Sequence, residues 1–142
     1  PYLGVTNYEY DNWIRLWLLG GNALPRGNAD QRYANKEKFE DMLRGVFAES
    51  RKHLMKDARL VVRTDRRRFT LETTAYALDD LWPDHRLFGR ANLSKKPTQT
   101  ALFGDKSAKP GEVDLLALPL GERAPDGFMD IREFSENGNL AA

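Results

Sequence analysis

The sequence contains no cysteine, so disulfide bonds and thiol chemistry are excluded. Its two histidines, His53 and His85, form neither an H-x-x-H nor an H-E-x-x-H pattern, so no metal site is expected. No apolar run is long enough to span a bilayer, and the first residues lack the basic start and apolar stretch of a signal peptide. These absences predict a cytoplasmic protein with no membrane partner.

The chain of 142 residues has the length of one ordinary domain. A hydrophobic content of 41% is enough for a core, and a charged content of 30% is normal for a globular protein. The net charge of +1 does not by itself indicate a nucleic-acid partner, so any basic surface must be local.

Two helices are predicted in the middle of the chain. The first spans Lys36 to Leu54, and the second has Thr70 as its cap and closes at Pro83. The apolar face of the first helix is expected to comprise Phe39, Met42, Leu43, Val46, Phe47 and Leu54. That of the second is expected to comprise Leu71, Thr74, Ala75, Leu78 and Leu81.

The N-terminal part is predicted to contain a loop, an aromatic helix and a second loop. Residues 1–10 have no clear period, and Asp11 is a suitable helix N-cap. Trp13 and Trp17 lie on one face of that helix, where a place in the core is favoured over stacking on a base. The helix ends at Gly20, and a long loop follows to residue 35.

Three strands are predicted, at Ala58–Thr64, His85–Leu93 and Val113–Pro119. The order helix, strand, helix, strand favours an α/β domain with parallel packing, and the last two strands suggest an antiparallel pair at one edge. This domain is expected to cover residues 1–120. Residues 121–142 are predicted to be a polar, poorly ordered tail.

The first two residues, Pro1 and Tyr2, match the end of the tetrapeptide Asp/Asn/Ser-Pro-Pro-Tyr. That tetrapeptide is the target-amine motif of S-adenosylmethionine-dependent amino-methyltransferases. Its first two residues, which include the donor of a side-chain oxygen, are absent from this sequence. If Asp/Asn/Ser-Pro is encoded immediately upstream of Pro1, the hypothesis is strengthened, whereas a methionine there would weaken it.

The chain resembles the C-terminal half of the DNA amino-methyltransferases of the N4-cytosine or N6-adenine type. The resemblance implies a partial Rossmann-like sheet with helices packed on it and an antiparallel edge pair. The glycine-rich cofactor motif of that family has no counterpart here, because Gly20-Gly21 follows a helix rather than a strand. The similar segments are residues 1–8, 11–17, 58–65, 69–72, 95–103 and 112–119.

The resemblance implies transfer of a methyl group from S-adenosylmethionine to the exocyclic amine of a flipped cytosine or adenine. Pro1 would belong to the turn that holds the amine, and Tyr2 would stack on the base. Gly4, Asn7 and Tyr8 would line the base pocket. The alternative for these loop residues is hydrogen bonding and packing where the loop joins the helix.

Two basic segments are candidates for contact with DNA phosphates. The first follows a strand and could instead be a solvated turn paired with Asp65 or Glu72, and the second could be an ordinary surface hairpin. The candidates are Arg66, Arg67 and Arg68 in the first segment, and Lys95, Lys96, Gln99 and Thr100 in the second.

The favoured hypothesis is therefore a fragment or subunit of a site-specific DNA methyltransferase that is inactive alone. Its partner would be the missing N-terminal half, another chain or a second copy. One alternative is a non-catalytic nucleic-acid-binding or assembly module with the same half-fold. Another is a tautomerase that uses the Pro1 amine as a base, but the loop-forming residues after Pro1 argue against it.

Overall fold

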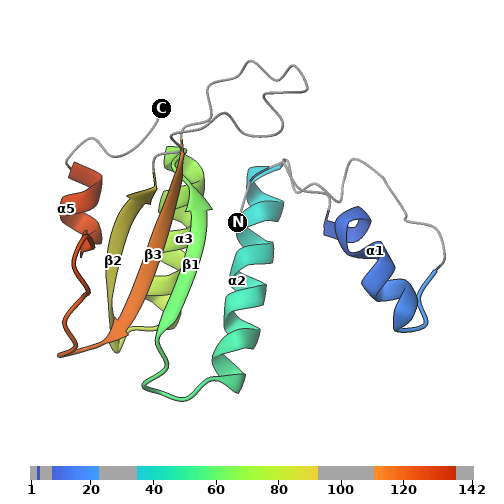
Figure 1. The fold of residues 1–142 in the computed structure, drawn as a ribbon, viewed down its shortest axis with the longest axis horizontal. Coiled ribbons are helices and arrows are strands. Elements are labelled where there is room, and N and C mark those ends of the chain that lie inside the picture. Colours follow the sequence, from blue (N-terminus) through green and yellow to red (C-terminus); the bar gives the residue numbers. More distant parts are fainter. Residues whose placement is uncertain (1–2, 4–7, 23–34, 93–110, 137–142) are drawn as a thin grey trace.

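The computed structural model describes residues 3, 8–22, 35–92 and 111–136 (Figure 1). In this part of the chain, four strands form an open sheet in the order β1-β3-β2-β4. The strands are β1 (Leu60–Asp65), β2 (His85–Asn92), β3 (Glu112–Pro119) and β4 (Met129–Asp130). Every pairing in the sheet is antiparallel.

The predicted parallel packing is wrong for hydrogen-bonded neighbours, because β3 lies between β1 and β2. β1 and β2 run in the same direction, since each is antiparallel to β3. The antiparallel pairing of β2 with β3 is confirmed, but β3 is an inner strand and not an edge strand. Its six consecutive buried residues explain this place, because a strand covered on both faces needs a nearly continuous apolar run.

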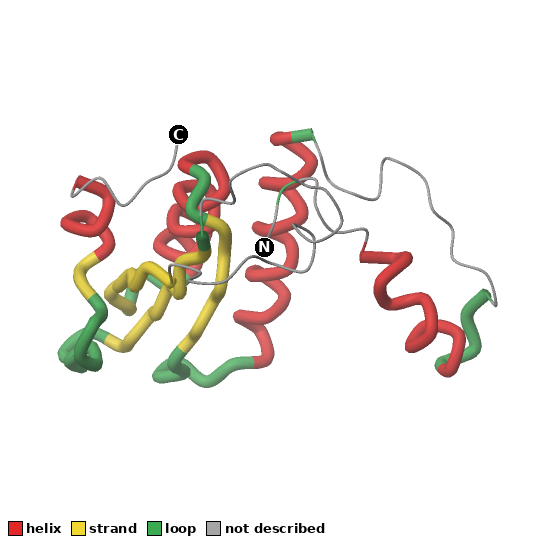
Figure 2. Tube along the Cα trace, turned by 45° about the horizontal axis from the view of Figure 1, so that its top comes forward, coloured by secondary structure: helices red, strands yellow, loops and turns green. Residues whose placement is uncertain are grey.

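One face of the sheet is covered by α3 (Arg68–Leu81), and α2 (Lys36–His53) lies beside α3 near the edge strand β1 (Figures 1 and 2). α2 packs against α3, and α3 contacts β1, β2 and β3. The Asn35 side chain caps α2 by accepting a hydrogen bond from the Lys38 N–H at 3.0 Å. The bounds of both helices agree with the predicted segments to within three residues.

The main core lies between the helices and the sheet. Phe39, Leu43 and Phe47 of α2 are buried there, whereas Val46 is exposed, so the predicted apolar face of α2 is only partly correct. Leu54 is also exposed, just after the helix. The remaining buried members are Leu71, Ala77, Leu78, Trp82, Leu87, Val113, Leu115, Ala117 and Phe134.

α1 (Tyr8–Leu18) lies apart from the sheet (Figure 1). It begins at Tyr8, so the prediction that Asp11 caps it is wrong. Trp17 is half exposed, which contradicts its predicted place in the core, and Leu18 is 74% exposed. The helix therefore presents apolar side chains to solvent.

The predicted poorly ordered tail is wrong for residues 121–136. These residues form β4 and α5 (Ile131–Glu136), which packs against β2. Phe134 is 2% exposed and reaches the main core over Gly89. Phe134, together with the pairing of β4 with β2, thus attaches this segment to the sheet.

Candidate functional site

The ends of β1 and β2 and the start of β3 meet at one end of the sheet. In the sheet register, Glu112 pairs with Asp65 on one side and with Asn92 on the other. We call this the Asp65 end of the sheet. In open α/β sheets, ligands bind outside the carboxyl ends of the strands, and two strands end here.

The predicted basic segment Arg66–Arg68 lies at the Asp65 end, where it joins β1 to α3. The Arg66 N–H donates to the Gly111 carbonyl at 3.1 Å. The Arg68 side chain donates to Glu72 at 2.9 Å, which is the local pairing that the solvated-turn alternative anticipates. Arg67 is an exposed N-cap residue of α3 and makes no side-chain capping bond.

The other predicted site residues are outside the described part of the chain. This applies to Pro1, Tyr2, Gly4, Asn7, Lys95, Lys96, Gln99 and Thr100. Tyr8 is the first residue of α1, but its side chain is not described. Asn92 and Gly111, which flank the segment with the predicted lysines, both lie at the Asp65 end.

Asp65 and Thr70 form a buried polar pair at the start of α3. Asp65 is 6% exposed, and its Oδ1 accepts a hydrogen bond from the Arg67 N–H at 2.9 Å. Its Oδ2 and the Oγ1 of Thr70, which is 0% exposed, make no hydrogen bond with any described residue. Burial raises the pKa of Asp65, and the Arg67 N–H and the nearby Thr70 hydroxyl offset part of that rise.

The prediction that Thr70 caps the second helix is therefore wrong. The helix begins two residues earlier, at Arg68, and the Asp65 carboxylate binds the Arg67 N–H before its first turn. Thr70 instead lies inside that turn, with its hydroxyl directed into the protein. A carboxylate at this position also matches the positive end of the helix dipole.

Asp114 of β3 organises a polar cluster on the face of the sheet opposite α3. Its side chain is 4% exposed and accepts hydrogen bonds from Arg63 at 2.7 and 3.2 Å. Arg90 donates at 3.0 Å and Asn92 at 2.7 Å, both to Oδ2. These donors, Arg63 above all, hold the pKa of Asp114 far below its usual range against the opposing effect of burial.

Arg86, a further arginine on this face, is also paired. Arg86 of β2 donates to Asp130 at 2.8 Å, and its guanidinium lies over the Phe88 ring. Arg90 lies over the Phe128 ring, 4.6 Å from its centroid. Because each of these arginines has an acidic partner, this face does not present a strongly positive surface for nucleic acid.

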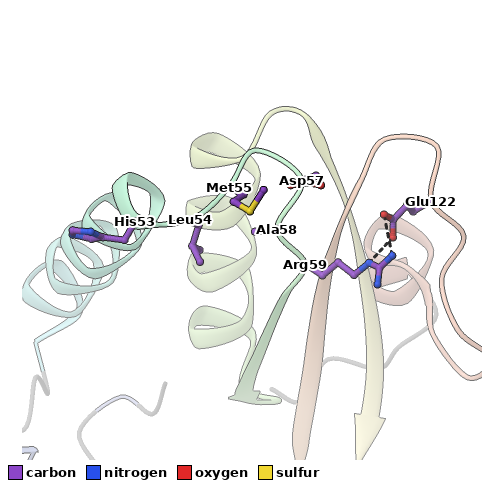
Figure 3. A pocket seen from close by; sticks show the side chains of 7 residues that line it. All are labelled: His53, Leu54, Met55, Asp57, Ala58, Arg59 and Glu122. Atoms are coloured by element: carbon purple, nitrogen blue, oxygen red, sulfur yellow. Dashed lines mark hydrogen bonds and ion pairs between the residues drawn. The ribbon is translucent and has the colours of Figure 1, made fainter.

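An open hollow lies at the other end of the sheet (Figure 3). It is lined by the turn after α2, including Met55 and Ala58, and by Glu122. Arg59 donates to Glu122 across it at 2.8 Å. None of the predicted site residues lies here, so the hollow does not coincide with the expected site.

Reasoning from the sequence missed Asp114 and assigned no role to Asp65. A signal for Asp114 was present, because a carboxylate inside the apolar run of β3 requires buried donors. The sequence presents Asp65 only as an ion-pair partner for neighbouring arginines. Its burial was missed because that burial depends on the packing of α3.

In the described part of the chain, no group of three His, Cys, Asp or Glu side chains could hold a metal ion. No helix described there is both long and apolar enough to cross a membrane. No known protein family, curated protein sequence or solved structure matches the chain.

Proposed function

We propose that this chain is the C-terminal half of a DNA amino-methyltransferase, with a partial Rossmann-like sheet. The observation that carries the proposal is the convergence of the similar segments at the Asp65 end. The strand Leu60–Asp65, the start of α3 and the strand Glu112–Pro119 come from separate parts of the resemblance and meet in space. Their polar residues then lie beside the ends of the segment with the predicted lysines.

The open edge of β1 supports the idea of half a domain. β1 pairs with β3 on one side only and is an edge strand of the sheet. Val61 of β1 is an exposed apolar residue on this strand. A strand that is paired on one side only can add a further strand on its other side.

In the proposed reaction, the missing half supplies the cofactor site and the oxygen-donating residue of the target-amine motif. S-adenosylmethionine supplies an electrophilic methyl group when it is bound there. The present chain contributes the turn with Pro1 and Tyr2, the base pocket with Gly4, Asn7 and Tyr8, and basic contacts to DNA. Catalysis then depends mainly on positioning.

The test compares this chain with the same chain extended upstream to the start of its reading frame. Each is incubated with DNA and S-adenosylmethionine that carries a radiolabelled methyl group. We expect labelled DNA only with the extended chain, and nucleoside analysis then identifies N4-methylcytosine or N6-methyladenine. A folded extended chain that labels no DNA contradicts the proposal.

Binding of the cofactor separates this function from a non-catalytic DNA-binding module. Calorimetry with S-adenosylmethionine should show no tight binding to residues 1–142 and clear binding to the extended chain. If the extended chain binds DNA but not S-adenosylmethionine, the module is the better description.

A further inference from the structure

α1 carries apolar side chains that no other described element covers. Four of them are between 46% and 74% exposed, namely Ile14, Leu16, Trp17 and Leu18. α1 makes no substantial contact with another described element, and α2 lies between α1 and the sheet in both views (Figures 1 and 2). Exposed apolar surface of this extent is typical of a contact between proteins.

The open hollow at the other end of the sheet also presents apolar side chains to solvent. It has a volume of about 570 Å³, and Leu54 and Met55 on its wall are 42% and 75% exposed. These two residues lie on one side of the hollow, and the ion pair between Arg59 and Glu122 lies on the other (Figure 3). An apolar hollow with a polar border is suited to bind the apolar face of a helix.

The charges at the border of the hollow are complementary to those of α1. Lys56 follows Met55 and Arg123 follows Glu122, so two cations adjoin residues that line the hollow. Both cations are exposed, and neither has an acidic partner among the described residues. The segment Tyr8–Leu18 contains two acidic residues and one basic residue. A helix with a net negative charge is therefore attracted to this border.

We propose that α1 of one copy of this chain docks into the hollow of a second copy, which is a contact that does not depend on the proposed function. The apolar side of α1 packs on Leu54 and Met55, and its net negative charge lies near Lys56 and Arg123. Residues 19–35 join α1 to α2 and can span at most about 60 Å when fully extended. Because α2 is only about 27 Å long, two copies can exchange their α1 helices. Reciprocal exchange gives a closed dimer in which both hollows are occupied.

Engineered cross-links test which surfaces meet, because the natural chain contains no cysteine. One chain carries Leu18→Cys, and a second chain, distinguished by a tag, carries Met55→Cys. We expect oxidation of the mixture to give a cross-linked pair with one chain of each kind. Tyr76→Cys, at a similarly exposed residue of α3, is the matched control for Met55→Cys. The cross-linked pair should be lost when this control replaces Met55→Cys.

Sedimentation velocity measures the strength of the dimer without a cross-link. Met55→Lys places a charge in the apolar contact and should raise the dissociation constant of the dimer at least about tenfold. Lys56→Glu combined with Arg123→Glu should also weaken the dimer, because the border of the hollow then repels α1. Lys38→Glu reverses an exposed charge at the opposite end of α2 and should leave the dissociation constant unchanged.

Other outcomes would overturn the inference. If Leu18→Cys cross-links to itself between two copies in preference to Met55→Cys, α1 pairs with α1 and not with the hollow. If a chain with both substitutions cross-links only within itself at every concentration, α1 covers its own hollow. Equal cross-linking with Met55→Cys and Tyr76→Cys would show that the contact is unspecific. A natural chain that stays monomeric at every concentration binds no second copy.

Discussion

Asp114 shows how one side chain can join three strands. It lies on the central strand and binds Arg63 of β1 and Arg90 of β2, so a single carboxylate links both neighbours of β3. The Asn92 amide supplies a further bond at 2.7 Å. The cluster lies on the face of the sheet opposite α3, which also carries the smaller buried apolar cluster of Phe88, Leu116 and Leu118.

Asp114→Asn should destabilise the fold. The change removes the negative charge while Arg63 and Arg90 remain next to the buried amide. Loss of one partner from a buried ion pair costs about 3–5 kcal/mol. Because both arginines are half exposed, we expect a smaller loss, of about 2 kcal/mol in the free energy of unfolding. Urea denaturation measures it. Asp80→Asn, at an exposed carboxylate that pairs with Arg44 at 2.8 Å, should give no measurable change. An equal loss in both variants would contradict the role of Asp114.

Asp65 and Asp114 should change stability with pH in opposite directions. The lowered pKa of Asp114 gives stability that is present above about pH 4, where an unfolded aspartate titrates, and is lost as the pH falls further. The raised pKa of Asp65 gives stability that is present below about pH 4 and is lost as the pH rises through its folded value.

Urea denaturation between pH 3 and pH 7 tests both signs. Relative to the wild type, Asp65→Asn should gain stability as the pH rises above about 4. Asp114→Asn should lose its disadvantage as the pH falls below that value. Parallel pH profiles for the wild type and a variant would show that the corresponding carboxyl does not have the shifted pKa.

At this scale the sequence supports local inferences better than distant ones. The pairing of Arg68 with Glu72 could be anticipated, because four residues separate neighbours on a helix surface. The Asp114 cluster could not, because Arg63, Arg90 and Asp114 become neighbours only in the strand register. The capping role given to Thr70 failed because the helix begins at Arg68, where Arg67 is the N-cap residue and the Asp65 carboxylate accepts its N–H.

Among the elements, α5 depends on a close contact between Gly89 and Phe134. A Cβ atom at Gly89 would lie 3.0 Å from Cγ and 3.1 Å from Cδ2 of the Phe134 ring. Gly89→Ala should therefore displace the ring and destabilise the protein by about 1–3 kcal/mol. Phe134→Leu in the same chain should recover part of that loss. A double-mutant cycle checks this, and strictly additive effects would exclude the contact as the cause.

Gly45→Ala is the matched control. Gly45 lies inside α2, and a Cβ atom there meets nothing within 4 Å. The substitution should raise the free energy of unfolding by about 0.5–1 kcal/mol, because alanine favours a helix over glycine. A loss of stability in this variant would show that methyl groups are poorly tolerated for reasons unrelated to Phe134.

The long elements were predictable because the residue pattern within each one indicates its secondary structure. α2 and α3 have apolar residues at helical spacing, and β1 is a short β-branched run. α5 was missed because its six residues contain few apolar positions, and its folding depends on the space that Gly89 leaves. The position of β3 was missed because the order of strands along the chain does not determine which strands are neighbours in the sheet.

For the whole molecule, the exposed apolar surface of α1 predicts self-association. Trp17 and Leu18 are exposed, and α1 lies away from the main core. Contiguous exposed apolar residues favour contacts between chains. In sedimentation velocity, the wild-type chain should form dimers or larger species as its concentration rises, and Leu18→Lys should reduce them.

Tyr76→Lys provides the control, because Tyr76 is an exposed apolar residue on α3. It should leave self-association unchanged. An equal reduction by both lysine variants would indicate a general charge effect. A wild-type chain that stays monomeric at every concentration would count against both the α1 contact and the half-domain hypothesis.

The place of β3 has a consequence for synthesis on the ribosome. β1 and β2 emerge first, but neither can pair with the other in the native sheet, because the strand between them is made later. The nascent chain must therefore hold two unpaired strands until Glu112–Pro119 has left the exit tunnel. A chain truncated before β3 retains α3, which connects β1 to β2 along the chain. It lacks the strand that pairs with both.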